Sequence, residues 1–195
     1  MRICVYCASS NACDTIYHDV AYRLGTEIGK AGHTLVYGGS SVGSMGKAAD
    51  GALAAGGQVI GILPRFMADL EWGHPGLTEL QLVEDMRERK HRLLADSDAV
   101  IAMPGGCGTL EELFEAITLK RLGLYFSPIL LLNTEGFYTP LQAFMQSVVD
   151  ARFMNREHLE MWSMIDEPEA ALAAIAATPR WREDARECDR SQFAA

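Results

Sequence analysis

The sequence has no long apolar run, no surplus of basic residues and no ordered set of cysteine pairs. No stretch approaches the roughly 20 consecutive apolar residues that a membrane helix requires. The opening residues, Met1-Arg2-Ile3, pass directly into a strand-like segment without a charged and apolar leader. We therefore expect no membrane segment and a cytoplasmic protein.

Acidic residues outnumber basic ones, with 26 Asp and Glu against 17 Lys and Arg and a net charge of −9. Binding along a nucleic-acid backbone needs Lys and Arg clustered on one face. This balance argues against a nucleic-acid partner and leaves room for one small anion.

The five cysteines are an odd number at irregular spacing, which is unlike a secreted disulfide framework. They are Cys4, Cys7, Cys13, Cys107 and Cys188. Cys4-Val-Tyr-Cys7 has the spacing of a redox motif, but it lies in an apolar, strand-like segment rather than at a helix start. No second pair follows that would complete a zinc site. We expect reduced thiols, with Cys4 and Cys7 packed in a strand, and no metal site.

The length and the hydrophobic pattern predict the fold. With 195 residues, 49% of them hydrophobic, the chain is long enough for one well-packed domain and too short for two ordinary ones. Short apolar runs alternate with longer amphipathic stretches, as in a parallel sheet covered by helices on both faces. The predicted strands are Ile3–Cys7, Thr34–Tyr37, Gln58–Leu63, Ala99–Met103 and Ile129–Leu132. The predicted helices lie at about Tyr17–Ala31, Met45–Ala55, Met86–Ala95, Leu110–Leu122, Thr139–Val149 and Glu169–Ala177.

This order predicts an α/β fold with a Rossmann-like, doubly wound parallel sheet in a single domain, residues 1–178. Its ligand site is expected beyond the carboxyl ends of the strands. The less regular segment Met67–Val83 is predicted to be a loop with a short helix over one side of the cleft. Pro179 begins a charged tail, residues 179–195, for which disorder and partner contact both remain open.

One turn follows each of the first two predicted strands, and only the second of these turns contains glycine. The first turn, residues 7–11, lacks the G-x-G-x-x-G that holds a dinucleotide pyrophosphate, which disfavours NAD binding. The second turn, residues 38–46, contains Gly43 and Gly46. These glycines either leave room for a ligand against bare backbone or allow a tight turn with close helix packing.

The most informative turn is Pro104-Gly105-Gly106-Cys107-Gly108-Thr109-Leu110-Glu111-Glu112. Its glycines allow consecutive N–H groups to point at one spot. A helix predicted to begin near Thr109 adds the positive end of its dipole, so a phosphate fits there. The turn lacks the Gly-Lys-Ser/Thr of a P-loop, which argues against nucleoside-triphosphate hydrolysis. Glu112 fits two roles, either capping the helix at Thr109 or acting on the bound molecule.

The densest basic cluster of this acidic chain is Met86–Arg92. Taken alone, it is typical of a solvated helix face with i,i+4 ion pairs of Asp85 with Arg89 and of Glu88 with Arg92. Beside a phosphate cradle, Arg89 and Lys90 become candidates to supply fixed positive charge.

At these residues the sequence resembles the LOG (Lonely Guy) family, the cytokinin-activating nucleoside monophosphate phosphoribohydrolases, many of which carry the older label "lysine decarboxylase-like". The family signature P-G-G-x-G-T-x-x-E is complete at Pro104–Glu112, and the partner motif with consecutive Arg and Lys falls at Met86–Lys90. Further similarity runs through Cys7-Ala8-Ser9-Ser10, Gly38-Gly39 to Met45-Gly46, Leu132-Asn133, Gly136-Phe137-Tyr138 and Asp150-Ala151-Arg152-Phe153.

The resemblance implies a homodimer that hydrolyses the N-glycosidic bond of adenosine 5'-monophosphate or an N6-prenylated form, without a cofactor. The products are the free adenine-type base and ribose 5-phosphate. Arg89 and Glu112 are implied as catalytic residues. The implied substrate contacts are Glu71, Lys90, Gly105, Gly106, Cys107, Gly108, Thr109, Leu110, Glu111 and Thr118, to which the second turn adds Gly43 and Gly46. Arg87 and Cys107 depart from the family pattern, where a His and an aromatic or small residue are common.

Elementary chemistry agrees with these roles. Breaking a nucleosidic bond develops positive charge on the ribose, so a carboxylate such as Glu112 stabilises the transition state and can orient or deprotonate water. Arg89 would hold the phosphate or ribose end. A decarboxylase would need a pyridoxal-phosphate lysine, and no lysine has an evident Schiff-base setting. Two other interpretations stay open, namely a nucleotide or molybdenum-cofactor carrier with the same fold and an oligomeric scaffold with a vestigial cleft.

Overall fold

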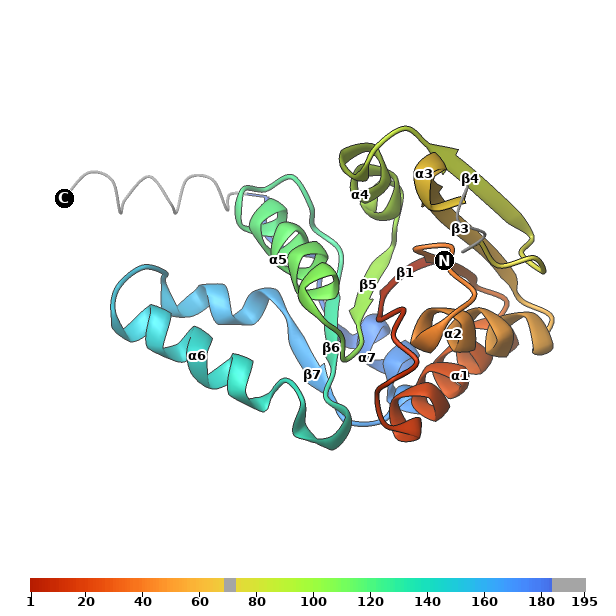
Figure 1. Cartoon of the computed structure of the whole chain (residues 1–195). Helices are drawn as coiled ribbons and strands as arrows, with labels where there is room; N and C mark the ends of the chain where they lie inside the picture. Colours follow the sequence, from red (N-terminus) through yellow and green to blue (C-terminus); the bar gives the residue numbers. More distant parts are fainter. Residues whose placement is uncertain (69–72, 184–195) are drawn as a thin grey trace.

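The computed structural model describes residues 1–68 and 73–183, in which seven strands form one parallel sheet (Figure 1). The strand order is β4-β3-β2-β1-β5-β6-β7. The strands are β1 (Arg2–Tyr6), β2 (Thr34–Tyr37), β3 (Gln58–Pro64), β4 (Glu79–Val83), β5 (Ala99–Ala102), β6 (Ile129–Leu132) and β7 (Ser163–Ile165). The chain builds outward from β1 to β4 and then returns to the other side of β1 for β5 to β7. The strand order therefore reverses between β1 and β5.

Helices cover both faces of this sheet (Figure 1). They are α1 (Thr15–Lys30), α2 (Gly43–Ala54), α3 (Arg65–Ala68), α4 (Met86–Leu94), α5 (Cys107–Arg121), α6 (Thr139–Asp150) and α7 (Ala171–Ala177). Helices α1, α2 and α7 pack on one face, and α4, α5 and α6 on the other. The prediction of a single-domain, doubly wound α/β fold is confirmed. Within the described residues, no helix combines the length and the apolarity needed to span a bilayer.

Strand alternation explains the burial of Cys4 and Cys7. Successive side chains of a strand point to opposite faces, so residues three positions apart lie on opposite sides of the sheet. Cys4 belongs to the core beneath α4 to α6, and Cys7 to the core beneath α1, α2 and α7. Both thiols are free, and burial raises the pKa of each well above its usual value. The predicted role in strand packing is confirmed for Cys4, whereas Cys7 directly follows β1 and packs in the core just beyond it.

The prediction of a loop with a short helix over Met67–Val83 is wrong at its end, because Glu79–Val83 forms β4. The three-residue strand β7 was also not predicted. Both lie at the edges of the sheet. Edge strands are less completely buried, and in β4 the side chains of Leu80 and Leu82 stay exposed, so the continuous apolar run of a buried strand is missing.

The chain end packs on the domain as far as the structure describes it. The backbone N–H of Trp181 donates to the Phe126 carbonyl at 2.8 Å. The buried Lys120 amine lies 5.7 Å from the centre of the Trp181 ring. In the predicted tail, residues 180–182 contact the domain, and residues 184–195 lie outside the described part. The predicted helix at Glu169–Ala177 begins as a 3-10 turn at Pro168–Ala170 before α7.

Two glycines let α1 and α2 approach at backbone distance. A Cβ at Gly25 would lie 2.0 Å from the Ala48 carbonyl oxygen, and one at Gly51 would lie 2.1 Å from the Tyr22 carbonyl oxygen. Both contacts are with backbone, which cannot turn away as a flexible side chain can. The helices must therefore separate if either glycine acquires a side chain.

We expect Gly25→Ala to lower the free energy of unfolding by about 1–3 kcal/mol, because the methyl group overpacks the interface between α1 and α2. Urea unfolding followed by circular dichroism measures this change. Gly73→Ala is the matched control, since its added methyl group would meet no described atom closer than 3.5 Å. Equal stabilities of the two variants would contradict the close approach of the helices.

Candidate active site

A cavity of about 450 Å³ lies at the carboxyl ends of the central strands. It is bounded by the loops after β1 and β2, the end of β3, and parts of α2 to α5. Its lining residues are Cys7, Ala8, Ser9, Ser10, Gly38, Ser40, Val42, Met45, Leu63, Met67, Met86, Arg89, Gly106, Gly108, Thr109 and Glu112. This position, next to the reversal of strand order, is where doubly wound folds bind ligands.

Arg89 is the buried cation of this cavity. Its Nε donates to the Ile62 carbonyl at 3.1 Å, its Nη2 to the Gly38 carbonyl at 3.2 Å, and its Nη1 to Glu112 Oε1 at 3.2 Å. Three acceptors from β3, the loop after β2 and α5 therefore fix the guanidinium. Gly38 leaves room for the guanidinium, because a Cβ at this position would lie 2.1 Å from Arg89 Nη2 and displace it.

The predicted ion pair of Asp85 with Arg89 is wrong. Asp85 instead caps α4, where its Oδ1 accepts a hydrogen bond from the Glu88 N–H at 2.8 Å. The capping role leaves Arg89 free to turn inward to the cavity. The other predicted pair, Glu88 with Arg92, is confirmed at 2.7 Å on the exposed side of the helix.

Glu112 faces Arg89 and does not cap its own helix. Helix α5 begins at Cys107, earlier than predicted, and no side chain caps its N-cap residue Gly106. The capping interpretation of Glu112 is therefore wrong, since Thr109 already lies inside the helix. Burial of the carboxyl raises the pKa of Glu112 to about 7 against the opposing effect of Arg89, and the nearby Glu111 raises it further. Near neutral pH both the acid and the carboxylate are populated.

The glycines of the turn before α5 have different surroundings. A Cβ at Gly105 would lie 2.2 Å from Thr109 Oγ1, so this glycine lets the turn pack on its own helix. A Cβ at Gly106 or Gly108 would meet no described atom within 4 Å, and both residues line the cavity. They leave bare backbone with open space beside the unsatisfied N–H groups of a helix start, an arrangement that accepts anions.

Several predicted substrate contacts lie away from the cavity. Lys90 points to the outer side of α4, where its amine contacts the Glu111 carboxylate and lies 3.1 Å from Glu115. Cys107 and Thr118 are exposed on α5, and Leu110 is partly buried. Thr109 lines the cavity, while Glu71 lies outside the described residues.

Gly43 and Gly46 join two loops rather than line the cavity. Gly43 has a φ of 64°, its N–H donates to Asn11 Oδ1 at 2.9 Å, and a Cβ would lie 2.6 Å from the Ser9 backbone. A Cβ at Gly46 would lie 2.1 Å from the Ser41 carbonyl oxygen. The tight-packing alternative thus describes both glycines, and their role as substrate contacts stays a prediction.

Sequence reasoning missed the apolar wall of the cavity. Met45, Met67 and Met86, with Val42 and Leu63, supply this wall. Leu63 lies at the end of β3, and Val42, Met67 and Met86 follow a strand within five residues, which is the signal that the doubly wound fold offers, whereas Met45 lies farther along in α2. Nothing in their residue type distinguishes them from core positions.

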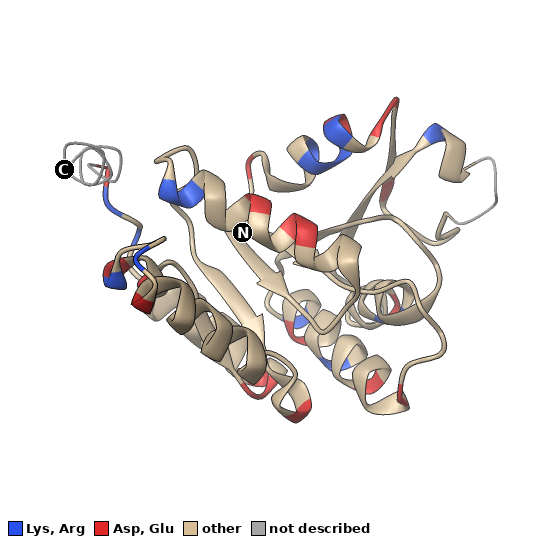
Figure 2. Ribbon diagram, turned by 60° about the vertical axis from the view of Figure 1, so that its left-hand side comes forward, with Lys and Arg blue, Asp and Glu red and all other residues tan. Residues whose placement is uncertain are grey.

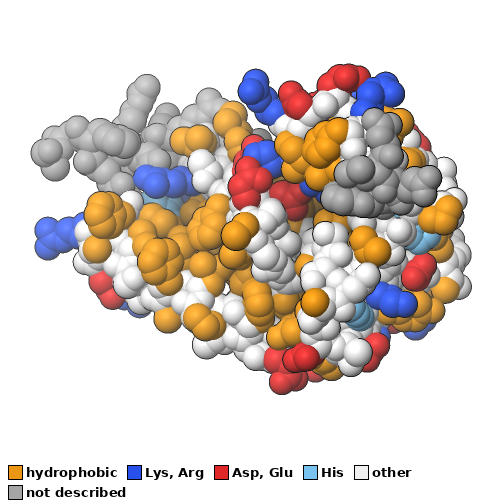
Figure 3. Space-filling model, viewed as in Figure 1, with side chains coloured by type: hydrophobic (Ala, Val, Ile, Leu, Met, Phe, Trp, Pro, Cys, Tyr) orange, Lys and Arg blue, Asp and Glu red, His pale blue; other side chains and the backbone are white. Residues whose placement is uncertain are grey.

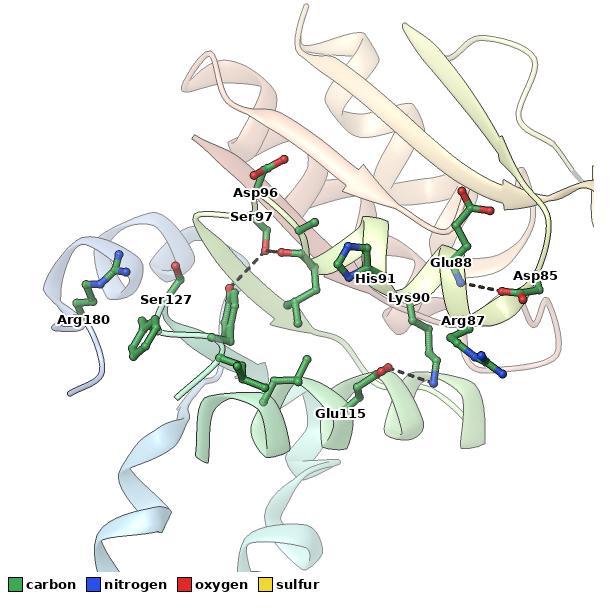
Figure 4. Close-up of a pocket in the computed structure, with 16 residues that line it drawn as sticks. Asp85, Arg87, Glu88, Lys90, His91, Asp96, Ser97, Glu115, Ser127 and Arg180 are labelled. Carbon is green, nitrogen blue, oxygen red and sulfur yellow. Dashed lines mark hydrogen bonds and ion pairs between the residues drawn. The ribbon is translucent and has the colours of Figure 1, made fainter. Parts of the chain in front are cut away.

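A larger groove of about 830 Å³ lies on the outer side of α4 and α5 (Figure 4). Lys90 and Glu115 point toward one another across it, and Arg180 lies at its far end. Figure 2 shows the acidic residues in the middle of α5 on the side of the basic residues of α4. Neither Arg89 nor Glu112 lines this groove, so the buried ion pair belongs to the smaller cavity.

Fold and site together define a Rossmann-like α/β protein with a buried Arg–Glu pair beside an anion-accepting glycine turn. A family model described as "Possible lysine decarboxylase" matches residues 45–175, and the chain belongs to this family. The resemblance to the LOG family is confirmed by curated relatives. The cytokinin riboside 5'-monophosphate phosphoribohydrolase LOG1 of Arabidopsis thaliana is 42% identical over 154 residues, which cover 79% of this chain and 72% of that protein.

Two relatives from rice are each named as a probable cytokinin riboside 5'-monophosphate phosphoribohydrolase. LOGL6 of Oryza sativa is 38% identical over 180 residues, or 92% of this chain and 72% of that protein. LOGL2 is 42% identical over 153 residues, or 78% of this chain and 63% of that protein. The chain thus spans less than two thirds of LOGL2 and about 72% of LOG1 and LOGL6.

Solved structures of similar fold include two proteins that handle molybdenum cofactor. The molybdenum cofactor carrier protein of Chlamydomonas reinhardtii is 23% identical with a TM-score of 0.69, covering 91% of this chain and 96% of that one. The molybdenum cofactor binding protein of Rippkaea orientalis is 26% identical with a TM-score of 0.68, covering 90% and 95%. Both support the fold assignment.

We expect Arg89→Met to raise the pKa of Glu112 above about 7, because the variant removes the charge that favours the carboxylate. Titration of carboxyl-labelled glutamate by ¹³C NMR measures the change, with Glu112→Gln assigning the resonance. Arg92→Met on the exposed face of α4 is the control and should leave that pKa unchanged. An unchanged value in Arg89→Met would show that the ion pair does not form in solution.

Proposed function

We propose that the chain hydrolyses the N-glycosidic bond of adenosine 5'-monophosphates, either unmodified or N6-prenylated. The observation that carries this proposal is the buried pair of Arg89 and Glu112 directly beside the open backbone of Gly106 and Gly108. Relatives at 38–42% identity are named for this activity. We also propose that it acts in the cytoplasm, which the four free cysteines of the described residues support.

In the proposed reaction, water adds its oxygen to the anomeric carbon as the bond from that carbon to the base nitrogen breaks. The base nitrogen gains a proton, and the products are free base and ribose 5-phosphate. A carboxyl group with a pKa near 7 suits both proton steps, because each form is available at neutral pH. Glu112 in its ionised form accepts the proton of the water and stabilises the positive ribose.

The remaining surfaces of the cavity fit the other parts of the substrate. The phosphate would bind the N–H groups at the start of α5, beside Gly106 and Gly108. Arg89 would hold the ribose and phosphate in line with Glu112. The apolar wall of Met45, Met67 and Met86 would pack on the flat base, since methionine adapts to aromatic surfaces.

We expect Arg89→Ala and Glu112→Ala to lose about 10²-fold or more of the rate of adenine release from the monophosphate. Arg92→Ala, on the same helix, should retain the parent rate. In the parent, kcat/KM should rise as the pH increases through about 7, because ionisation of Glu112 creates the base. Chromatography of the base released from the monophosphate measures the rates of the variants and, at a series of pH values, the kcat/KM of the parent. A panel of nucleosides, monophosphates and triphosphates tests which substrate class the parent cleaves. Parent-like rates in both alanine variants would refute the assignment.

The carrier interpretation remains the alternative, since two structures of this fold bind or carry molybdenum cofactor. A pure carrier has little use for the ionisable Glu112 beside a bound phosphate. The same chromatography distinguishes the two functions. Tight nucleotide binding without any release of base over hours would favour the carrier.

We further propose that the chain works as a homodimer through α5 and α6. Figure 3 shows hydrophobic side chains gathered over the region where Figure 1 draws these helices. Phe144 of α6 is 60% exposed, Phe153, which follows α6, is 75% exposed, and Leu122, which follows α5, is 44% exposed. Large exposed apolar patches mark association sites. The predicted substrate contact Thr118 is also exposed on α5, so a second copy docking here would bring that residue into an interface.

We expect Phe144→Asp to convert the dimer into a species of one chain mass, 21.4 kDa, because a charge at the centre of an apolar interface is costly. Sedimentation at micromolar concentration measures the mass. Phe66→Asp, at another exposed phenylalanine on α3, should leave the dimer intact. A parent protein that sediments only as 21.4 kDa would contradict the proposed dimer.

A further inference from the structure

We infer that Tyr138 is a positioning residue for the anion-binding turn, a role that rests on the function proposed for that turn. Tyr138 immediately precedes α6 and is 1% exposed. Its hydroxyl donates to the Met103 carbonyl at 2.7 Å, and its own N–H donates to Asn133 Oδ1 at 2.8 Å. The ring and the hydroxyl are therefore both fixed, although neither lines the cavity.

The bond to Met103 acts at the point where the chain leaves the sheet. The Met103 N–H donates to the Tyr6 carbonyl at 2.8 Å, which ties this residue to the end of β1. The Met103 carbonyl then accepts from Tyr138. Because the peptide group is planar and proline has a fixed φ, orienting this carbonyl sets the direction in which Pro104 enters the glycine turn.

On its helix side the glycine turn is held by the packing of Gly105 on Thr109 and by the bond from the Leu110 N–H to the Gly106 carbonyl at 3.0 Å, so its strand side depends on the Met103 peptide. Gly106 and Gly108 have no side chains, and an added Cβ at either would meet no described atom within 4 Å. Helix α5 begins at Cys107 without a side-chain cap. A change in the orientation of the Met103 peptide would therefore alter the directions of the first N–H groups of α5 and the position of Glu112. Burial keeps the hydroxyl a donor, since it raises the pKa of Tyr138 well above its usual value.

The test compares Tyr138→Phe with Tyr125→Phe. Tyr125 is also a buried tyrosine of the same core, but its hydroxyl lies 3.4 Å from Ser97 Oγ, before β5 rather than after it. Each variant keeps its ring and loses one hydroxyl, so general destabilisation should be similar in both. A selective effect on the turn distinguishes a positioning role from a structural one.

In Tyr138→Phe we expect faster amide hydrogen exchange in the peptide covering residues 105–114, by about tenfold in the amides from Leu110 onward, which are the hydrogen-bonded ones, with no change there in Tyr125→Phe. We expect kcat/KM for adenosine monophosphate to fall about tenfold or more. Inhibition by ribose 5-phosphate should weaken, whereas inhibition by free adenine should not. If Tyr138→Phe does not fold, Asn133→Ala, which loosens the Tyr138 backbone, should give the same pattern of exchange.

Equal exchange rates in the turn for both phenylalanine variants, or an unchanged ribose 5-phosphate inhibition in Tyr138→Phe, would overturn the positioning role. Failure of the proposed function has a different signature. In that case the parent protein releases no base from any monophosphate, while the exchange comparison, which needs no turnover, still decides the role of Tyr138.

Discussion

The buried contact between Arg89 and Glu112 is the constraint on which the site depends. Both side chains are under one tenth exposed, so each loses most of its hydration. The attraction within a buried pair repays that loss only when the remaining hydrogen bonds are also made. Here the carbonyls of Gly38 and Ile62 complete the bonding of the guanidinium. Replacing the pair by apolar residues would be energetically easier, so its presence is better explained by chemistry than by stability.

The parallel sheet supplies those carbonyls in the right place. Gly38 directly follows β2, and Ile62 lies in β3, so both belong to neighbouring strands whose carboxyl ends meet at one edge. Helix α4, which comes later in the chain, returns over this edge and brings Arg89 to it. Helix α5 then brings Glu112 from the other side of the strand-order reversal. The ion pair therefore closes the crevice that the topology opens.

Much of this arrangement could be predicted from the sequence, because the signals are local. The five inner strands read as apolar runs, and the glycines of the turn before α5 indicated an anion site. The resemblance to the LOG family, rather than a local signal, implied Arg89 and Glu112 as partners in one reaction. The sequence could not show that they touch, since Asp85 and Thr109 offered equally good local partners. Burial in the folded protein decides that Arg89 pairs with Glu112 and not with a local partner. The edge strand β4 could not be predicted for a different reason, since its polar residues break the apolar pattern.

Two consecutive residues of α4 explain how the helices stay in register. Successive helical side chains point about 100° apart, so Arg89 and Lys90 leave α4 in different directions. Arg89 reaches the buried Glu112, and Lys90 reaches Glu111 and Glu115 on the outer side of α5. The outer contacts are partly exposed and contribute little stability by themselves. Because they bridge the same two helices, they limit how far α4 can slide or roll, and such motion would change the distance between Arg89 and Glu112. The outer contacts of Lys90 can thus preserve the geometry of the buried pair.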